Sequence, residues 1–219
     1  MERYLKNIGT LSPQENESLQ RRKAAVVGCG GLGGYVIELL GRLGVGHITA
    51  IDYDVFQPSN LNRQILSDEA SLGKSKALQA QKRMKLVNSN VTITPIMEKL
   101  DRQNGMQILS GHDVIIDALD NIPSRLLLQD IAEALQIPMV HGAIAGWYGQ
   151  VSTIFPGDRT LSKIYPDPDA KGVEKELGNP SFTPALVASI EVSEALKILI
   201  GRGSLLRKKL LSINVLDQE

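Results

Sequence analysis

The chain has 219 residues, 42% of them hydrophobic, which is enough for one substantial core or for a core with a small appended subdomain. Its 24 Lys and Arg residues balance 24 Asp and Glu residues, which argues against nucleic acid as a partner and against attraction to an anionic membrane surface. A single cysteine excludes an internal disulfide bond and a zinc site built from thiolates of this chain alone, and it fits a reducing, cytoplasmic setting.

The N-terminal residues are polar, and residues 1–23 are expected to form a helical arm before the first strand. No apolar run approaches the roughly 20 residues of a membrane span, so we expect a soluble protein without a membrane partner. Apolar runs typical of strands follow at 24–28, 47–52, 91–97, 113–117, 138–142 and 150–155, and a last one at 210–216. Patterns typical of helices cover 32–43, 74–87, 122–135 and 184–200.

The first five predicted strands alternate with helix-compatible segments, which is typical of a parallel sheet covered on both faces. The sequence therefore predicts an α/β fold, a doubly wound three-layer sandwich with a largely parallel, mixed sheet, in one domain spanning 1–219. Between 156 and 183 the chain is polar, charged and interrupted by Pro and Gly, and we expect this stretch to be a mobile loop.

A glycine-rich stretch joins the first strand to the first long helix, and an acidic cluster follows about twenty residues later. Gly28 permits a tight turn, Gly30 lets backbone N–H groups approach a phosphate, and Gly33 lets helix and strand pack closely. Asp52 can accept hydrogen bonds from ribose hydroxyls. The motif predicts a nucleotide-binding, Rossmann-like unit whose candidate binding residues are Gly28, Gly30, Gly31, Gly33, Asp52 and Asp54.

Three further segments favour one chemistry: Ser59-Asn60-Leu61-Asn62-Arg63-Gln64, Gly73-Lys74-Ser75-Lys76, and Asp120-Asn121 directly after the fourth predicted strand. A hydride-transfer site needs none of them. Attack on the α-phosphate of ATP needs cations against the charge that develops on the phosphates and a hard oxygen ligand for magnesium. Arg63, Lys76 and Asp120 can supply these groups and are the candidate catalytic residues, with Asp120 as the metal ligand.

In their order and spacing these motifs resemble the activating-enzyme family of ThiF, MoeB and HesA type, and the similarity covers roughly residues 3–200. Members adenylate the C-terminal glycine of a ubiquitin-like sulfur-carrier protein with Mg-ATP and release pyrophosphate. The resemblance implies that Asp52 holds the ribose, that Asn60 and Arg63 contact phosphates, and that Lys76 neutralises the transition state. It further implies ATP and Mg²⁺ at the site, with Asp120 on the metal, a homodimer, and a carrier with a Gly-Gly C terminus that supplies sulfur for thiamine, molybdopterin or a related product.

The sequence departs from longer members of that family in its cysteines and near its N terminus. It lacks the paired cysteines that hold a structural zinc, so no zinc is expected, and 157–183 contains no cysteine for covalent transfer. Lys6 stands where the family places an arginine that reaches the partner subunit's nucleotide, and Arg3 lies close enough to substitute. Lysine keeps the charge of arginine but loses its bidentate fork.

Other interpretations remain open at this point. The same site could adenylate a different carboxylate or a modified tRNA nucleoside, as zinc-free relatives that cyclise threonylcarbamoyladenosine do, or the chain could be a nucleotide-binding adaptor. A nicotinamide-dependent oxidoreductase leaves the segment 59–64 unexplained. Trp147, Tyr148 and the region of Phe182 are candidates for a carrier surface, with local packing as the alternative, and the three histidines, among them His141, are interpreted as structural.

Overall fold

The computed structural model describes residues 2–167, 169, 170, 172 and 174–218. Within them a single seven-stranded sheet runs through the molecule in the order β3-β2-β1-β4-β5-β6-β7. The strands are β1 Lys23–Val27, β2 His47–Ile51, β3 Thr92–Ile96, β4 Val114–Asp117, β5 Met139–Ala145, β6 Tyr148–Ile154 and β7 Leu211–Asn214. Neighbouring strands among β1 to β5 pair in parallel, whereas β6 pairs antiparallel with β5 and β7 pairs antiparallel with β6. The predicted largely parallel, mixed sheet is therefore confirmed.

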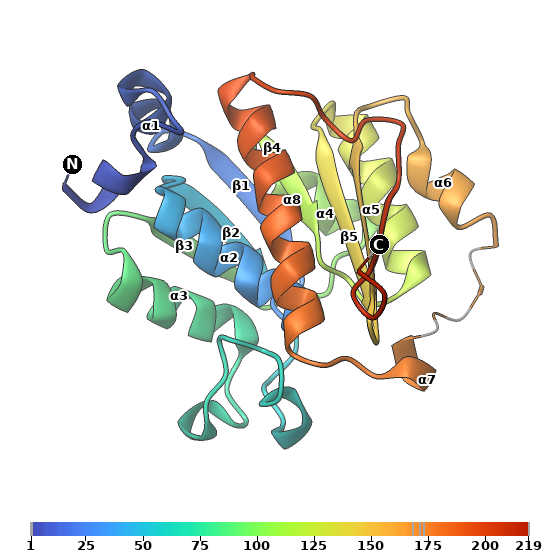
Figure 1. The fold of residues 1–219 in the computed structure, drawn as a ribbon. Coiled ribbons are helices and arrows are strands. Elements are labelled where there is room, and N and C mark those ends of the chain that lie inside the picture. Colours follow the sequence, from blue (N-terminus) through green and yellow to red (C-terminus); the bar gives the residue numbers. More distant parts are fainter. Residues whose placement is uncertain (1, 168, 171, 173, 219) are drawn as a thin grey trace.

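Helices cover both faces of this sheet (Figure 1). On one face lie α2 Gly31–Leu43, α3 Lys76–Val87 and α8 Phe182–Ile200, and on the other lie α4 Arg102–Leu109, α5 Ile122–Leu135 and α6 Thr160–Ile164. Alternate residues of each strand feed two separate cores: Ala24 and Val26 pack toward α2, while Ala25 and Val27 pack toward α5. The predicted doubly wound three-layer sandwich is therefore confirmed.

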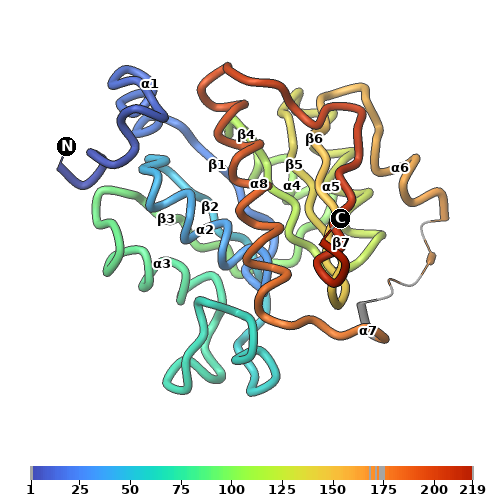
Figure 2. Tube along the Cα trace, in the orientation of Figure 1, coloured from blue at the N-terminus to red at the C-terminus, as the bar shows by residue number. Residues whose placement is uncertain are grey.

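The N-terminal arm holds the 3-10 helix η1 Glu2–Asn7 and the helix α1 Pro13–Leu19, and β1 begins at Lys23. Between β2 and α3 the chain makes an excursion that contains η2 Pro58–Asn60 and η3 Glu69–Ser71 and extends away from the sheet (Figure 1). After α8 the chain runs back across the molecule to β7, which lies beside β6 (Figure 2). No helix in the described part of the chain is long and apolar enough to span a bilayer.

The four predicted long helices are present, with ends shifted by at most two residues. The prediction missed α4, whose eight residues carry a short apolar stripe and whose start is set by the Asp101 side chain, which accepts from the backbone N–H groups of Gln103 and Asn104 at 2.8 Å. The segment predicted as a loop, 156–183, contains α6, the four-residue helix α7 Glu174–Leu177, and the first residues of α8. Helices of four or five residues are too short to give a periodic signal. Positions 168, 171 and 173 of that segment lie outside the described residues.

Candidate active site

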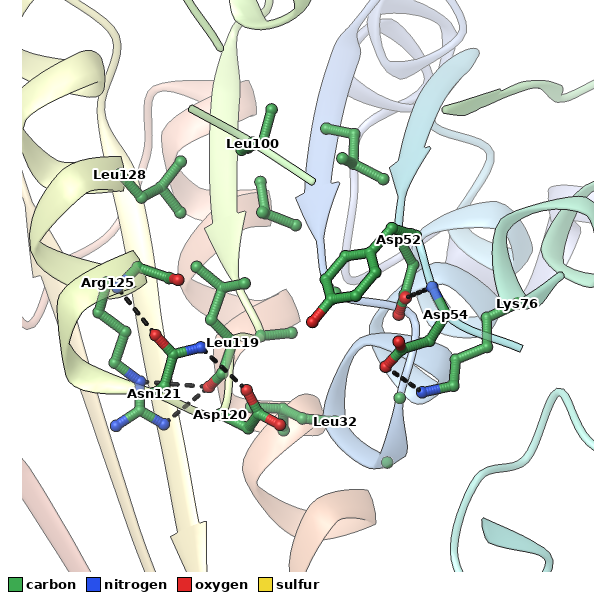
Figure 3. Close-up of a pocket in the computed structure, with 18 of the residues that line it drawn as sticks. Leu32, Asp52, Asp54, Lys76, Leu100, Leu119, Asp120, Asn121, Arg125 and Leu128 are labelled. Atoms are coloured by element: carbon green, nitrogen blue, oxygen red, sulfur yellow. Dashed lines mark hydrogen bonds and ion pairs between the residues drawn. The ribbon is translucent and has the colours of Figure 1, made fainter. Parts of the chain in front are cut away.

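A pocket of about 290 Å³ lies at the carboxyl ends of β1, β2 and β4. This is the point where the strand order reverses, because β1 continues to β2 on one side and is flanked by β4 on the other. Most of the candidate residues line this pocket. The lining residues with polar or charged side chains are Asp52, Tyr53, Asp54, Arg63, Gln64, Lys76, Glu98, Lys99, Asp120, Asn121, Ser124, Arg125 and Asn179. The two groups Asp52, Asp54, Lys76 and Asp120, Asn121, Arg125 face each other across the cavity (Figure 3).

The glycine turn between β1 and α2 forms the floor of the pocket. Gly28 has φ +100°, and a Cβ there would lie 2.5 Å from the carbonyl oxygen of Ala118 on the neighbouring strand connection. A Cβ at Gly33 would lie 1.8 Å from the carbonyl oxygen of Gly28, so the first turn of α2 packs directly on the loop. Gly30 caps α2 without a side-chain hydrogen bond, which leaves the first N–H groups of the helix for an anion.

Asp52 shapes this turn from the end of β2. Its two carboxylate oxygens accept the backbone N–H groups of Cys29 and Asp54, each at 2.8 Å. Burial raises the pKa of Asp52 above its ordinary value, while these two N–H donors oppose the shift. Each oxygen keeps a second lone pair, so the carboxylate can still accept from a ribose hydroxyl. The thiol of Cys29 is fully buried under the turn, and burial raises its pKa well above the ordinary value, so it is not a nucleophile of this site.

Two cations stand on this side of the pocket. Lys76, the first residue of α3, is buried, and its Nζ lies 3.2 Å from an Oδ of the half-exposed Asp54. The side chain of Arg63 lies over Gly31 at the start of α2, and its Nη1 donates to the Asn62 side chain at 2.9 Å and to the Ser59 carbonyl at 3.1 Å. Within the described residues neither cation is held by a buried anion, so both can turn toward phosphates.

Asp120 projects from the loop after β4 and is exposed. Its Oδ1 accepts from Asn121 Nδ2 at 3.1 Å, and Asn121 in turn caps α5 by accepting from the Ser124 N–H at 3.0 Å. The described residues contain no group of three or more His, Cys, Asp or Glu side chains placed to hold a metal ion. One exposed carboxylate beside a nucleotide pocket fits Mg²⁺, because this ion keeps several waters and binds through one or two carboxylates plus phosphate oxygens.

The structure does not bring Asn60 into the pocket wall. Its Oδ1 accepts the Gln57 N–H at 3.0 Å and thereby caps η2, and the residue is not among those that line the cavity. The predicted contact between Asn60 and a phosphate therefore requires the side chain to leave its cap, and it stays a prediction.

Several lining residues were not predicted individually from the sequence, among them Gln64, Asn179 and Arg125. Gln64 lies beside Gly30, and its Oε1 is buried without a hydrogen-bond partner in the described chain, as is Oδ1 of Asn179. Arg125 from α5 donates from Nε and Nη2 to the carbonyl of Leu119 at 3.2 and 2.8 Å. The only sequence signal for Gln64 was its place at the end of the motif 59–64. No sequence pattern pointed to Asn179 and Arg125, which the fold brings to the pocket.

His141, interpreted from sequence as structural, has a partner that the sequence did not reveal. It is fully buried on β5, and its Nδ1 lies 2.7 Å from an Oδ of the fully buried Asp117 on β4. Burial lowers the pKa of His141, so the ring is neutral at neutral pH despite the neighbouring carboxylate. Because the parallel register places Asp117 opposite His141, the pair follows from strand pairing.

The comparisons with known proteins agree with this geometry. A family model described as "ThiF family" matches residues 3–219. The SAMP-activating enzyme E1 of Haloferax volcanii is 32% identical over 222 residues, covering 99% of this chain and 82% of the relative. The sulfur carrier protein adenylyltransferase of Thermus thermophilus is 37% identical over 216 residues, covering 94% and 80%. Among solved structures, the tRNA N6-threonylcarbamoyladenosine dehydratase TcdA of E. coli in complex with ATP has a TM-score of 0.78 and 22% identity, covering 91% of this chain and 94% of that one.

Proposed function

The chain belongs to the ThiF family, and from this premise we propose that it is an ATP-dependent, E1-like adenylyltransferase that activates the C-terminal glycine of a ubiquitin-like sulfur-carrier protein. The names of two relatives refer to activation of SAMP and to adenylylation of a sulfur carrier protein. The product would be an acyl-adenylate for the synthesis of a sulfur-containing cofactor, and a cytoplasmic setting, which supplies ATP, is part of the proposal.

One observation carries the proposal: four segments far apart in the sequence converge on a single pocket. The glycine turn and the start of α2 offer N–H groups to phosphates, Arg63 and Lys76 add two cations, and Asp120 adds an exposed carboxylate on the opposite side. Hydride transfer develops no charge on phosphates and does not need this set of charged groups. Transfer of an adenylyl group does, because negative charge develops on the phosphates in its transition state.

In the proposed reaction an oxygen of the carrier's terminal carboxylate attacks the α-phosphorus of ATP. A bond forms between that oxygen and the phosphorus, the bond from the α-phosphorus to the bridging oxygen breaks, and pyrophosphate leaves. Lys76 and Arg63 stabilise the negative charge that develops on the phosphates, and Asp52 holds the ribose. Asp120 would hold Mg²⁺, which when bound neutralises charge on the phosphates.

A homodimer is also part of the proposal, because the resemblance assigns a cation near the N terminus to the partner subunit's nucleotide. Arg3 is engaged within its own chain, where its guanidinium bonds the side chain of Asn88. Lys6, the last basic residue of η1, is exposed. We therefore assign the reach toward the partner subunit to Lys6 in preference to Arg3.

The strongest alternative substrate is a different carboxylate or a modified tRNA nucleoside. The likeness to the tRNA-modifying TcdA is at 22% identity and concerns the fold alone. The net charge of zero gives no electrostatic attraction to tRNA. An adaptor that binds nucleotide without chemistry does not need Arg63, Lys76 and Asp120 together at one pocket.

Pyrophosphate–ATP exchange tests the proposal. The purified protein is assayed with Mg²⁺ and a panel of Gly-Gly-ended carrier proteins, alongside Asp120→Ala and the control Glu17→Ala, which removes an exposed carboxylate from α1. Exchange that depends on one carrier, is lost in Asp120→Ala and persists in Glu17→Ala is the expected result. Absence of exchange with every carrier, in a protein that binds ATP, would overturn the carrier assignment and favour another acid substrate.

A further inference from the structure

A closed ring of hydrogen bonds lies directly behind Asp120. Asp117 accepts the Leu119 N–H at 3.1 Å through Oδ1 and faces His141 Nδ1 at 2.7 Å through Oδ2. Nε2 of His141 lies 3.3 Å from the hydroxyl of Tyr165, and that hydroxyl accepts from Arg125 Nη1 at 3.1 Å. Arg125 closes the ring on the carbonyl of Leu119.

The donors and acceptors of this ring match one protonation state. A neutral His141 donates from Nδ1 to Asp117 and accepts at Nε2 from the Tyr165 hydroxyl. That hydroxyl then has two lone pairs, which accept from Arg125 and from Gln150. All of these groups are satisfied at once, and the ring is built from β4, α5, β5 and the chain that follows α6. Such a network has one arrangement, which makes it rigid.

The ring fixes both polar groups of residue 119. Asp117 holds its N–H, and Arg125 holds its C=O with two hydrogen bonds. Asp120 is the next residue and lies beside Leu119 and Arg125 (Figure 3), so fixing this peptide unit restricts the directions in which its carboxylate can leave the chain. His141 and Tyr165 are not among the residues that line the pocket, yet they connect Asp117 and Arg125, the two groups that hold residue 119.

We propose that His141 and Tyr165 are positioning residues for the metal ligand: by joining Asp117 to Arg125 they hold the turn that carries Asp120 in the geometry that binds Mg²⁺ with ATP. This inference rests on the proposed function, since it assigns Asp120 to the metal. Outer partners of this kind commonly change metal affinity or activity by about 10- to 100-fold when they are removed.

Tyr165→Phe removes the hydroxyl and so breaks the ring of hydrogen bonds. It keeps the aromatic side chain that packs against His141 and Arg125. The test compares wild type, Tyr165→Phe and Tyr35→Phe, a control that removes the hydroxyl of a half-buried tyrosine on α2. ATP binding is measured by calorimetry across a titration of Mg²⁺ and again in EDTA, and exchange is measured over the same Mg²⁺ range.

The expected result is that Tyr165→Phe raises the Mg²⁺ concentration for half-maximal ATP binding by about tenfold or more, with ATP affinity in EDTA unchanged and Tyr35→Phe like wild type. A variant that is less stable to heat but has the wild-type Mg²⁺ dependence would show that the ring only packs the core, and it would overturn the inference. Because ATP binding needs no carrier, failure of every carrier in the exchange assay counts against the proposed substrate alone, and calorimetry still tests the role of the ring.

Discussion

The two sides of the pocket hold their charged groups in different ways. On the glycine-turn side, which comprises residues 28–33, 52, 54, 63 and 76, the two cations make contacts with near neighbours in sequence or with the half-exposed Asp54. On the ring side, which comprises Asp117, Leu119, Asp120, Arg125, His141 and Tyr165, the hydrogen bonds join residues up to 40 positions apart and include the fully buried pair of Asp117 and His141.

The difference separates groups that must change partners from a group that must stay in place. Lys76 and Arg63 can exchange their present acceptors for phosphate oxygens at little cost, because those acceptors lie near solvent. Asp120 itself is exposed, and its direction depends on the rigid turn behind it. On the glycine-turn side the cations can therefore exchange their acceptors for phosphates, whereas on the ring side the geometry of Asp120 stays fixed.

The largest effect is expected from breaking the glycine-turn side at its buried cation. Lys76→Ala removes the charge that we place against the transition state, and it should lower the rate of pyrophosphate exchange by about 10²- to 10³-fold. Lys74→Ala removes an exposed lysine two residues earlier and serves as the matched control. A loss below tenfold in Lys76→Ala would mean that the lysine stays with Asp54 during the reaction.

A second substitution, Gly33→Ala, strains the contact between α2 and the glycine turn. Gly33→Ala would place a Cβ 1.8 Å from the carbonyl oxygen of Gly28, so strand and helix must separate. We expect the free energy of unfolding, measured with urea, to fall by about 3 kcal/mol, the upper end of ordinary overpacking. At Gly30 a Cβ would meet only the Gln64 side chain at 3.6 Å, so Gly30→Ala should cost much less. Equal losses in the two variants would show that the close contact at Gly33 is not what holds the turn.

The smallest expected effect is on stability and concerns a buried carboxyl group. This group packs against β5 on the face opposite to His141. Glu191 on α8 is fully buried against Gly142, and neither of its oxygens has a hydrogen-bond partner in the described chain. Burial, with the charge of Asp117, raises its pKa well above the ordinary value of 4.5. The folded protein therefore binds a proton that the unfolded chain releases, and stability falls as pH rises above that ordinary value.

Glu191→Gln keeps the shape of the side chain and removes the titration. Relative to wild type, its free energy of unfolding should rise between pH 5.5 and pH 6.5, by at most about 1 kcal/mol. Urea unfolding at these two pH values measures the difference. Parallel pH profiles for the two proteins would show that Glu191 is ionised in the folded state.

The same contrast explains how much the sequence could predict. The spacing of Gly28, Gly30 and Gly33 and the position of Asp52 are local patterns. The structure places the three glycines at the junction of β1 and α2, and Asp52 at the end of β2 with a hydrogen bond to that turn. Asn60 shows that membership of a motif does not by itself place a side chain in the pocket, because this side chain caps η2 and does not line the cavity. The ring escaped prediction entirely: Asp117 meets His141 through the register of β4 with β5, and Tyr165 arrives from a segment without periodic pattern. Contacts that depend on strand register and on chain crossings leave no local signal.

Cys29 gives the glycine turn a chemical reporter of its own. The thiol is fully buried beneath the turn, so a thiol reagent in solution reacts only with molecules in which this region has opened. Since the sequence contains no other cysteine, every modified sulfur records that one event. The labelling rate of the unaltered protein therefore measures how often the phosphate-binding turn opens, and its slowing by ATP would measure how firmly a nucleotide keeps the turn closed.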